Sequence, residues 1–174
     1  QTIESSVTYN TFGQVETITD PNGNVSRYTY DPTTSYPTQI TQGLGRPEAA
    51  TTGLAYDSVG NITAITDANI RTTTLEYNAQ NQLVKTTAAS PFNYATYFTY
   101  NANGNLVQAD RQAAASPGTR PATGTSSPTD GWQTVRTTYD LLDQVASITD
   151  DLDHTTNFTY DAAGNRTGVT DPLL

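Results

Sequence analysis

A twelve-residue phrase that occurs more than once constrains this chain more than any other feature. YDSVGNITAITD at 56–67 and YDAAGNRTGVTD at 160–171 both begin with Tyr-Asp, carry Gly-Asn at the fifth and sixth places, and end with Thr-Asp. A catalytic motif is normally needed once, whereas a phrase that returns along a chain is typical of a repeat architecture. We therefore expect a chain built from copies of one structural unit.

The start of the phrase occurs more often than the whole phrase. Seven Tyr-Asp or Tyr-Asn dipeptides lie along the chain: Tyr9-Asn10, Tyr30-Asp31, Tyr56-Asp57, Tyr77-Asn78, Tyr100-Asn101, Tyr139-Asp140 and Tyr160-Asp161. Their successive spacings are 21, 26, 21, 23, 39 and 21 residues. Because the shortest spacing recurs and the others are longer, we interpret the unit as about 21 residues with occasional insertions.

The residues around each dipeptide predict a strand followed by a tight turn. Aromatic or aliphatic residues stand two places before several of the tyrosines, as in Tyr28/Tyr30 and Phe158/Tyr160, and this alternation is typical of a strand. Asp or Asn then opens a turn, and a residue with positive φ closes it three places later. Glycine or a residue that tolerates this conformation fills the closing place: Gly13, Gly60, Asn81, Gly104, Asp143 and Gly164.

The segment after the turn predicts a second strand with an irregularity. Apolar residues recur six and nine places after the tyrosine, as in Val15/Ile18 and Ile62/Ile65. A spacing of three does not fit strict alternation, so either a β-bulge shifts the register or both faces of the sheet are covered. A second turn, such as Asp20-Pro21-Asn22-Gly23, would return the chain, which gives one β-hairpin per unit.

One segment departs from this pattern. Residues 112–130 are rich in Ala, Ser, Thr, Pro and Gly, and we expect a flexible insert there. The units resume at Tyr139, so we interpret 1–174 as a single repeat region. The chain contains no Met, and both ends resemble cuts, which suggests an internal slice of a longer array.

Composition supports a β fold and narrows the function classes. Thr and Tyr are abundant and favour strands, while charged residues make up 14% of the chain, too few for the signature of intrinsic disorder. A net charge of −9 argues against nucleic acid as a partner. With no cysteine, thiolate metal sites and disulfides are excluded. No apolar run reaches the roughly 20 residues of a membrane span, and no signal peptide is evident within these residues.

The phrase Tyr-Asp-x-x-Gly-Asn with a following Thr-Asp resembles the YD repeat of the Rhs family, which includes bacterial Rhs toxins, the B and C components of insecticidal toxin complexes, and the teneurins. The resemblance implies β-hairpins in a continuous spiralling sheet that forms a hollow shell, which encloses a C-terminal toxin in toxin members. It implies packing and hydrogen-bonding roles, and no catalysis, for Tyr30, Tyr56, Tyr100, Tyr139 and Tyr160. The longer core signature with a self-cleaving aspartyl site is missing from this sequence, as is a toxin domain.

Other candidate sites are weaker than a plain turn. His154, the only histidine, lies beside Asp150, Asp151 and Asp153 and could serve as a base or a metal ligand, but an acidic turn explains the same residues. Asp20, Asn22 and Asn24 resemble the start of a calcium loop, yet the acidic ligand that should follow falls on Asp31 of the next repeat. We therefore predict no catalytic residue, no metal site, no cofactor and no enzyme activity.

The sequence leaves three functions open. The first is a structural segment of an extracellular or cell-surface bacterial shell, whose partners are neighbouring repeats of the same or an identical chain and an enclosed polypeptide. The second is an adhesion module that binds glycans through exposed tyrosines. The third is a filament that assembles head to tail, because Asp171 would precede the Tyr9 of a following copy by nearly the spacing seen within the array. A propeller is a rival architecture, but its blades require regular pairing of repeats, which the spacings do not show.

Overall fold

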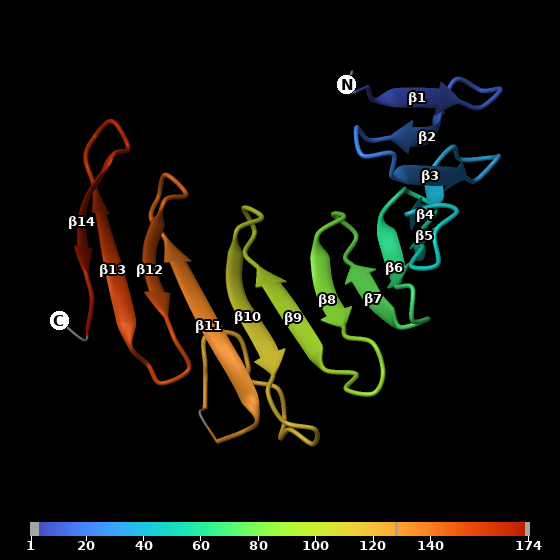
Figure 1. Cartoon of the computed structure of the whole chain (residues 1–174). Helices are drawn as coiled ribbons and strands as arrows, with labels where there is room; N and C mark the ends of the chain where they lie inside the picture. The colour runs from blue at the N-terminus through green and yellow to red at the C-terminus, as the bar shows by residue number, and fades with distance from the viewer. Residues whose placement is uncertain (1–3, 128, 173–174) are drawn as a thin grey trace. The chain divides into compact units, whose positions relative to one another are not determined.

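All the regular structure of the chain is β-strand. The computed structural model describes residues 4–127 and 129–172, and no helix occurs among them. The predicted all-β fold of hairpin repeats is confirmed. The strands (Figure 1) are β1 (Ser6–Tyr9), β2 (Val15–Thr19), β3 (Val25–Tyr30), β4 (Pro37–Gln42), β5 (Ala50–Tyr56), β6 (Ile62–Thr66), β7 (Thr72–Tyr77), β8 (Leu83–Thr87), β9 (Ala95–Tyr100), β10 (Leu106–Gln112), β11 (Trp132–Tyr139), β12 (Val145–Thr149), β13 (Thr155–Tyr160) and β14 (Arg166–Thr170).

The chain divides into two compact units, residues 1–75 and 76–174. In the first unit the strands lie in the sheet in chain order from β1 to β7, and in the second they do so from β8 to β14. The pairings within each unit are antiparallel, as short turns between consecutive strands require. Each strand therefore contacts the strands next to it in sequence, which is the behaviour of a repeat protein.

A β-bulge occurs at the same place in the hairpins that begin with the repeat tyrosine. Tyr56 lies opposite Ile62 and Leu54 opposite Ile65, so Thr63 is an extra residue on the second strand. The same shift follows the other tyrosines of paired hairpins: Tyr9, Tyr30, Tyr100, Tyr139 and Tyr160. The bulge places apolar residues that are three apart in sequence, such as Ile62 and Ile65, on the same face as the tyrosine. The sequence left two explanations of this spacing open, and the bulge is the correct one.

The two faces of the sheet differ in composition. The face that carries the repeat tyrosines, here the tyrosine face, also carries the paired aliphatic residues such as Leu54 and Ile65. The opposite face, here the threonine face, carries Ser and Thr, whose hydroxyls pair between neighbouring strands at 2.7–3.1 Å. The pairs are Thr8–Thr17, Thr41–Thr51, Thr66–Thr72, Thr138–Ser147, Thr149–Thr155 and Thr159–Thr167.

Burial is concentrated in one place of the second unit. The buried residues of the described chain are Ala95, Gln108, Asp110, Trp132 and Thr134. All five belong to β9, β10 and β11, and the register places them on the threonine face. The repeat tyrosines are partly buried, except Tyr9, which is 62% exposed.

The segment above this cluster is the predicted insert. Gln112, the last residue of β10, pairs with Trp132, the first residue of β11, so residues 113–131 form the connection between these two paired strands. Residues of the connection hydrogen-bond to the threonine face beneath it, as described below. The flexibility of 112–130 and the single repeat region over 1–174 stay predictions.

Candidate functional site

Five of the repeat tyrosines link their hairpin to the hairpin before it. The hydroxyl of Tyr30 donates a hydrogen bond of 2.8 Å to the carbonyl of Val15, and Val15 lies opposite the preceding repeat tyrosine, Tyr9. The same bond, at 2.8–3.0 Å, joins Tyr56 to Pro37, Tyr100 to Leu83, Tyr139 to Leu106 and Tyr160 to Val145. The ring packs in the sheet while its hydroxyl finds a backbone acceptor, which is how partly buried tyrosines are stabilised.

The Tyr-Asp turn is held by one carboxylate. Asp57 Oδ1 accepts hydrogen bonds from the backbone N–H groups of Val59 and Asn61, and its Oδ2 accepts one from the side-chain amide of Asn61. These bonds lower the pKa of Asp57, with the Asn61 amide as the largest cause. Asp161 and Asn165 repeat the arrangement, and their bonds lower the pKa of Asp161 in the same way.

The residues at the closing place of the turn adopt positive φ, as the sequence predicts. The φ angle is 98° at Gly60 and 84° at Gly164, and the two non-glycine substitutes, Asn81 and Asp143, have φ of 60° and 58°. Gly13 and Gly104 also have positive φ. The turn after Tyr30 differs: it is longer, Ser35 takes the positive φ, and Asp31 accepts from the backbone of Thr33 and Thr34, which lowers its pKa.

In two of the turns that begin with Asn, the hydrogen bond between side chains is reversed. Asn10 Nδ2 donates to Gln14 Oε1 at 2.8 Å, and Asn78 Nδ2 donates to Gln82 Oε1 at 2.8 Å. An amide that donates its N–H₂ requires an acceptor four places on, whereas a carboxylate requires a donor there. The place therefore holds Asn or Gln in the turns that follow the common pattern: Gln14, Asn61, Gln82, Asn105, Gln144 and Asn165.

Several residues at this place also contact the next turn. Gln82 Nε2 donates to the carbonyl of Gly104 at 3.3 Å, and a Cβ on Gly104 would lie 3.2 Å from that nitrogen. Asn105 and Asn103 both donate to Asp143 Oδ1, at 2.6 and 2.9 Å. The Tyr-Asp turns are thus joined side by side as well as closed individually. This role was not predicted from the sequence, although Asn or Gln recurs there five places after the tyrosine.

The turns at the other ends of the strands use the same chemistry. His154 donates its backbone N–H to Asp150 Oδ1, and its Nδ1 lies 3.0 Å from Asp150 Oδ2, where Asn61 places its amide against Asp57. The backbone hydrogen bond is the largest cause that lowers the pKa of Asp150, and the imidazole contact lowers it further. The Asp20 carboxylate accepts from Asn22 and Asn24. No group of three or more His, Cys, Asp or Glu that could hold a metal occurs within 4–127 and 129–172.

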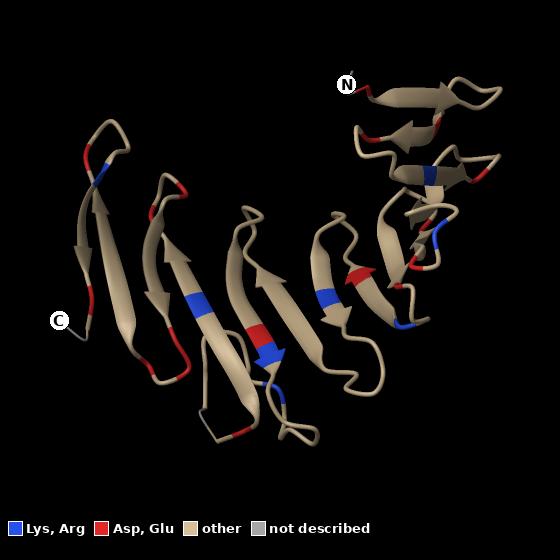
Figure 2. Cartoon of the chain, in the orientation of Figure 1, with Lys and Arg blue, Asp and Glu red and all other residues tan. Residues whose placement is uncertain are grey.

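Charge follows this arrangement. Figure 2 shows Asp and Glu mainly in the turns at both ends of the strands, with few basic residues among them. In the strands, Glu76 pairs with Lys85 at 2.6 Å, and Asp110 pairs with Arg120 of the insert at 2.7 Å.

The insert covers a polar cluster in which the members satisfy one another. Asp110 is fully buried; its Oδ1 accepts from Gln108 Nε2 at 2.8 Å and from Thr134 Oγ1 at 2.9 Å. Its Oδ2 accepts from Arg120 Nε at 2.7 Å, and the Arg120 guanidinium lies over the Tyr97 ring at 4.6 Å. A buried charge is tolerated only with such partners.

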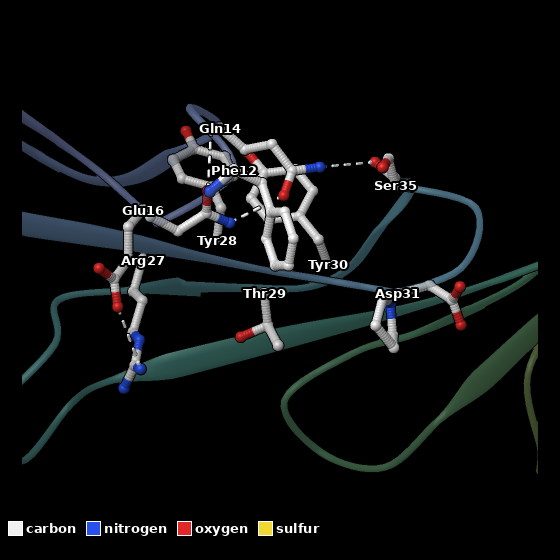
Figure 3. A pocket seen from close by; sticks show the side chains of 11 residues that line it. Phe12, Gln14, Glu16, Arg27, Tyr28, Thr29, Tyr30, Asp31 and Ser35 are labelled. Carbon is white, nitrogen blue, oxygen red and sulfur yellow. Dashed lines mark hydrogen bonds and ion pairs between the residues drawn. The ribbon is translucent and has the colours of Figure 1, made fainter.

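A shallow pocket of about 230 Å³ lies in the first unit (Figure 3). The rings of Phe12, Tyr28 and Tyr30 line it together with polar side chains. Arg27 pairs with Glu16 at 3.5 Å on one side, and Gln14 donates to the carbonyl of Ser35 on the other. The pocket therefore offers apolar ring surface beside hydrogen-bonding groups.

The model of the RHS repeat family matches residues 9–47, 56–91 and 139–173, together more than half of the chain. The chain belongs to the RHS repeat family. The resemblance that the Tyr-Asp phrase suggested is confirmed, and the match leaves out residues 92–138, where the insert lies. No curated protein sequence matches the chain.

Solved structures with the same fold are toxin-complex components. The RHS repeat chain is similar to a chain of the TcdB2-TccC3-TEV structure, with 19% identity and a TM-score of 0.60 over 95% of this chain and 10% of that one. It is also similar to a chain of a mutant Tc holotoxin pore from Photorhabdus luminescens, with 16% identity and a TM-score of 0.55 over 95% and 11%. A chain of the TcdB2-TccC3 structure is 17% identical, with a TM-score of 0.53 over 92% of this chain and 11% of that one. The chain thus spans about a tenth of the length of the solved chains it matches.

Within 4–127 and 129–172 there is no helix long and apolar enough to cross a membrane.

Proposed function

We propose that this RHS repeat chain is a structural segment of the wall of an extracellular or cell-surface β-shell, and that it carries no enzyme activity. The observation that carries the proposal is the uniformity of the hairpins: the bulge, the turn and the tyrosine bond recur at the same places. A residue that recurs in every unit serves each unit alike, as a structural role requires. A site for chemistry would need a constellation that breaks the repeat.

The enclosed partner in this proposal is a polypeptide, such as a toxin. Support comes from the fold, which the chain shares with TcdB2-TccC3 structures, and from the family match. Because the chain spans only about a tenth of those solved chains, the wall would be completed by further repeats of the same chain or of identical chains.

Electron cryo-microscopy of the intact protein that carries this segment tests the proposal. We expect a hollow shell whose wall contains hairpins β1 to β14 in chain order. A segment that projects from the particle as a free arm would contradict the proposal. As a second test, Tyr100→Phe with Tyr139→Phe removes two of the bonds between hairpins and should make the enclosed polypeptide accessible to protease, whereas the exposed Tyr9→Phe should not.

The pocket in the first unit favours a second candidate, a glycan-binding adhesion module. Ring faces beside amide and carboxylate groups suit sugars, and Phe12 is 80% exposed there. Glycan-array binding that Tyr28→Ala and Phe12→Ala both abolish, and Tyr9→Ala leaves unchanged, would support this candidate. Absence of binding at high protein concentration would exclude it.

Strand exposure favours a third candidate, head-to-tail assembly. All four residues of β1 and four of the five of β14 are exposed, and exposed strands at the edge of a sheet can pair with another chain. Size-exclusion chromatography with light scattering on the 174-residue chain decides this candidate. A monomer that stays folded at high concentration would rule it out.

A further inference from the structure

The insert lies on the sheet as a bound peptide would lie on a receptor. Side chains of the strands, rather than their backbone, hold the insert backbone: Trp132 Nε1 donates to the carbonyl of Gly118 at 3.1 Å, and Gln108 Nε2 donates to that of Ala122 at 3.3 Å. Gly124 donates its N–H to Gln108 Oε1 at 2.7 Å, and its carbonyl accepts from Arg136 at 3.1 Å. The segment turns at its end, where the N–H of Thr125 donates to the carbonyl of Ala122 at 3.0 Å. Contacts to the backbone do not depend on the side chains of the bound segment.

One side chain of the insert is recognised specifically. Arg120 Nε donates to Asp110 Oδ2 at 2.7 Å, its Nη2 donates to Thr99 Oγ1 at 2.9 Å, and the guanidinium lies 4.6 Å from the centre of the Tyr97 ring. A carboxylate, a hydroxyl and an aromatic face together match a planar guanidinium rather than an ammonium ion. Trp132 packs edge-on against Tyr97, with ring centroids 5.8 Å apart.

The residues of the sheet that contact Arg120 and the insert backbone lie in three paired strands. Tyr97 and Thr99 belong to β9, Asp110 to β10, and Thr134 and Trp132 to β11, so the register of three paired strands sets their positions. Asp110 is held by Gln108 and Thr134 even without Arg120. The Arg120 side chain remains 35% exposed, which leaves a route from solvent to the guanidinium site.

We propose that the threonine face of β9 to β11 is a binding site for a Gly- and Pro-rich polypeptide segment that presents one arginine, and that the insert of this chain occupies the site in cis. The Arg120 guanidinium is the anchor, and the backbone of 118–124 supplies the remaining contacts. An arginine-bearing segment of another polypeptide would compete with the insert for the same groups.

The first test uses the full chain with Arg120→Ala. We expect ethylguanidinium to raise the thermal unfolding midpoint of this variant and to bind it at least tenfold more tightly than it binds the wild type, in which Arg120 fills the site. Ethylammonium should have no such effect, because it lacks the planar fork. Arg71→Ala, in an exposed turn, is the matched control and should respond as the wild type does.

Two outcomes of this test would overturn the proposal. One is an equal response of Arg120→Ala and the wild type to ethylguanidinium. The other applies if Arg120→Ala is unfolded at neutral pH: ethylguanidinium must then restore its β circular dichroism spectrum, and failure to do so contradicts a guanidinium site.

The second test supplies the segment in trans. Residues 113–131 are replaced by Asn-Gly, a two-residue hairpin turn, and the variant is titrated with the peptide PGTRPATGT, which has the sequence of 117–125. Trp132 is the only tryptophan, so its fluorescence reports binding at the site. We expect the peptide with Ala in place of Arg to bind at least tenfold more weakly. Equal binding of the two peptides, or no binding of either, would overturn the proposal.

Discussion

The hairpin of β13 and β14 and the hairpin of β10 and β11 differ in their cover: the connection 113–131 contacts a face of the second by hydrogen bonds. None of the described residues of β13 and β14 is buried, whereas β10 and β11 contain four of the five buried residues of the described chain. A two-stranded unit exposes both of its faces, so it can bury a side chain fully only when another segment covers it.

The comparison also shows which side chains the insert buries on the threonine face. The largest fully buried side chains on the threonine face are polar: Gln108, Asp110 and Thr134. Ala95 and Trp132 are the buried apolar residues of the same face. Buried polar groups destabilise a protein unless they are hydrogen-bonded. In this cluster Asp110 bonds both Gln108 and Thr134, and Arg120 supplies the opposite charge. The insert therefore stabilises the sheet through hydrogen bonds to these polar groups as well as by covering Trp132.

The largest effect should come from the buried ring of this cluster. Trp132→Ala removes an indole that is 6% exposed, contacts Tyr97 and donates to Gly118, and we expect a loss of roughly 3–5 kcal/mol in the free energy of unfolding. Tyr9→Ala, at an exposed ring of a plain hairpin, is the control and should change stability little. Urea unfolding followed by circular dichroism measures both. Similar losses in the two variants would remove the distinction between covered and plain hairpins.

Removal of the cover should have the next largest effect. With residues 113–131 replaced by Asn-Gly, β10 and β11 can still pair from Gln112 and Trp132 onward, so we expect the β spectrum to remain, as the sequence alone also predicts. The lost bonds from the insert to Asp110, Gln108 and Thr99, at about 0.5–1.5 kcal/mol each, should lower stability by roughly 2–4 kcal/mol, partly offset by the shorter loop. Unchanged stability in urea would show that the insert is a passive excursion.

Substitutions at two glycines outside the covered hairpin should separate the effect of backbone conformation from the effect of a neighbouring side chain. The turn pattern alone predicts that Asn replaces either Gly60 or Gly164 with little cost, as Asn81 does naturally. A Cβ at Gly60, however, would lie 2.6 Å from the Tyr36 hydroxyl, whereas at Gly164 it would lie 3.4 Å from Gln144 Nε2.

We therefore expect Gly60→Asn to cost about 1–3 kcal/mol and Gly164→Asn to be nearly silent. Val should cost roughly 1–3 kcal/mol at either place, because a β-branched residue is strained at positive φ. Thermal unfolding of the four variants provides the measurement. An equal response to Asn at the two places would mean that Tyr36 moves aside.

The smallest effect concerns pH. Asp161 has a lowered pKa in the folded chain, so its contribution to stability is present above the unfolded value of about 3.9 and is lost as pH falls through the lower folded value. Asn101 occupies this place in the turn between β9 and β10 and does not titrate. Asp161→Asn combined with Asn165→Gln would build the Asn78–Gln82 pair in this turn.

We expect the double variant to match the wild type in urea unfolding at pH 6 and to lose less stability than the wild type at pH 3. Asp161→Asn alone should be less stable than the double variant at pH 6, because the new amide then lacks the Gln acceptor that Asn78 has in Gln82. Identical pH dependence of the wild type and the double variant would contradict the role of this carboxylate.

The sequence predicts the parts of the fold that depend on near neighbours. The turns follow from Asp or Asn and a residue with positive φ three places on, and both belong to one short phrase. The strand before each tyrosine follows from alternation. The β-bulge was one of two explanations, since spacing alone cannot tell an extra residue from a covered face, and only the pairing of Tyr56 with Ile62 distinguishes them.

The remaining features depend on contacts between residues far apart. The bond from Gln82 to Gly104 requires neighbouring turns to be aligned, and a single unit gives no sign of it. Three of the five buried residues of the described chain are Gln, Asp and Thr, so an apolar pattern in the sequence does not mark the cluster at Asp110. The composition of 112–130 predicted flexibility, but its arginine meets a partner ten residues earlier through the folding of the loop.

The bulge has a consequence for how a gene of this kind can change in length. A strand shifted by one residue turns every side chain to the opposite face, so a single codon gained or lost within a strand would exchange the tyrosine and threonine faces from that point on. The paired hairpins that begin with a repeat tyrosine each carry an extra residue at the same place, so duplication or loss of a whole unit by recombination leaves the faces of the other units unchanged. Residues added at a turn also leave the faces of the strands unchanged, and the 39-residue spacing from Tyr100 to Tyr139 contains such an addition. Genes for these arrays can therefore grow in steps of about 21 codons or at their turns.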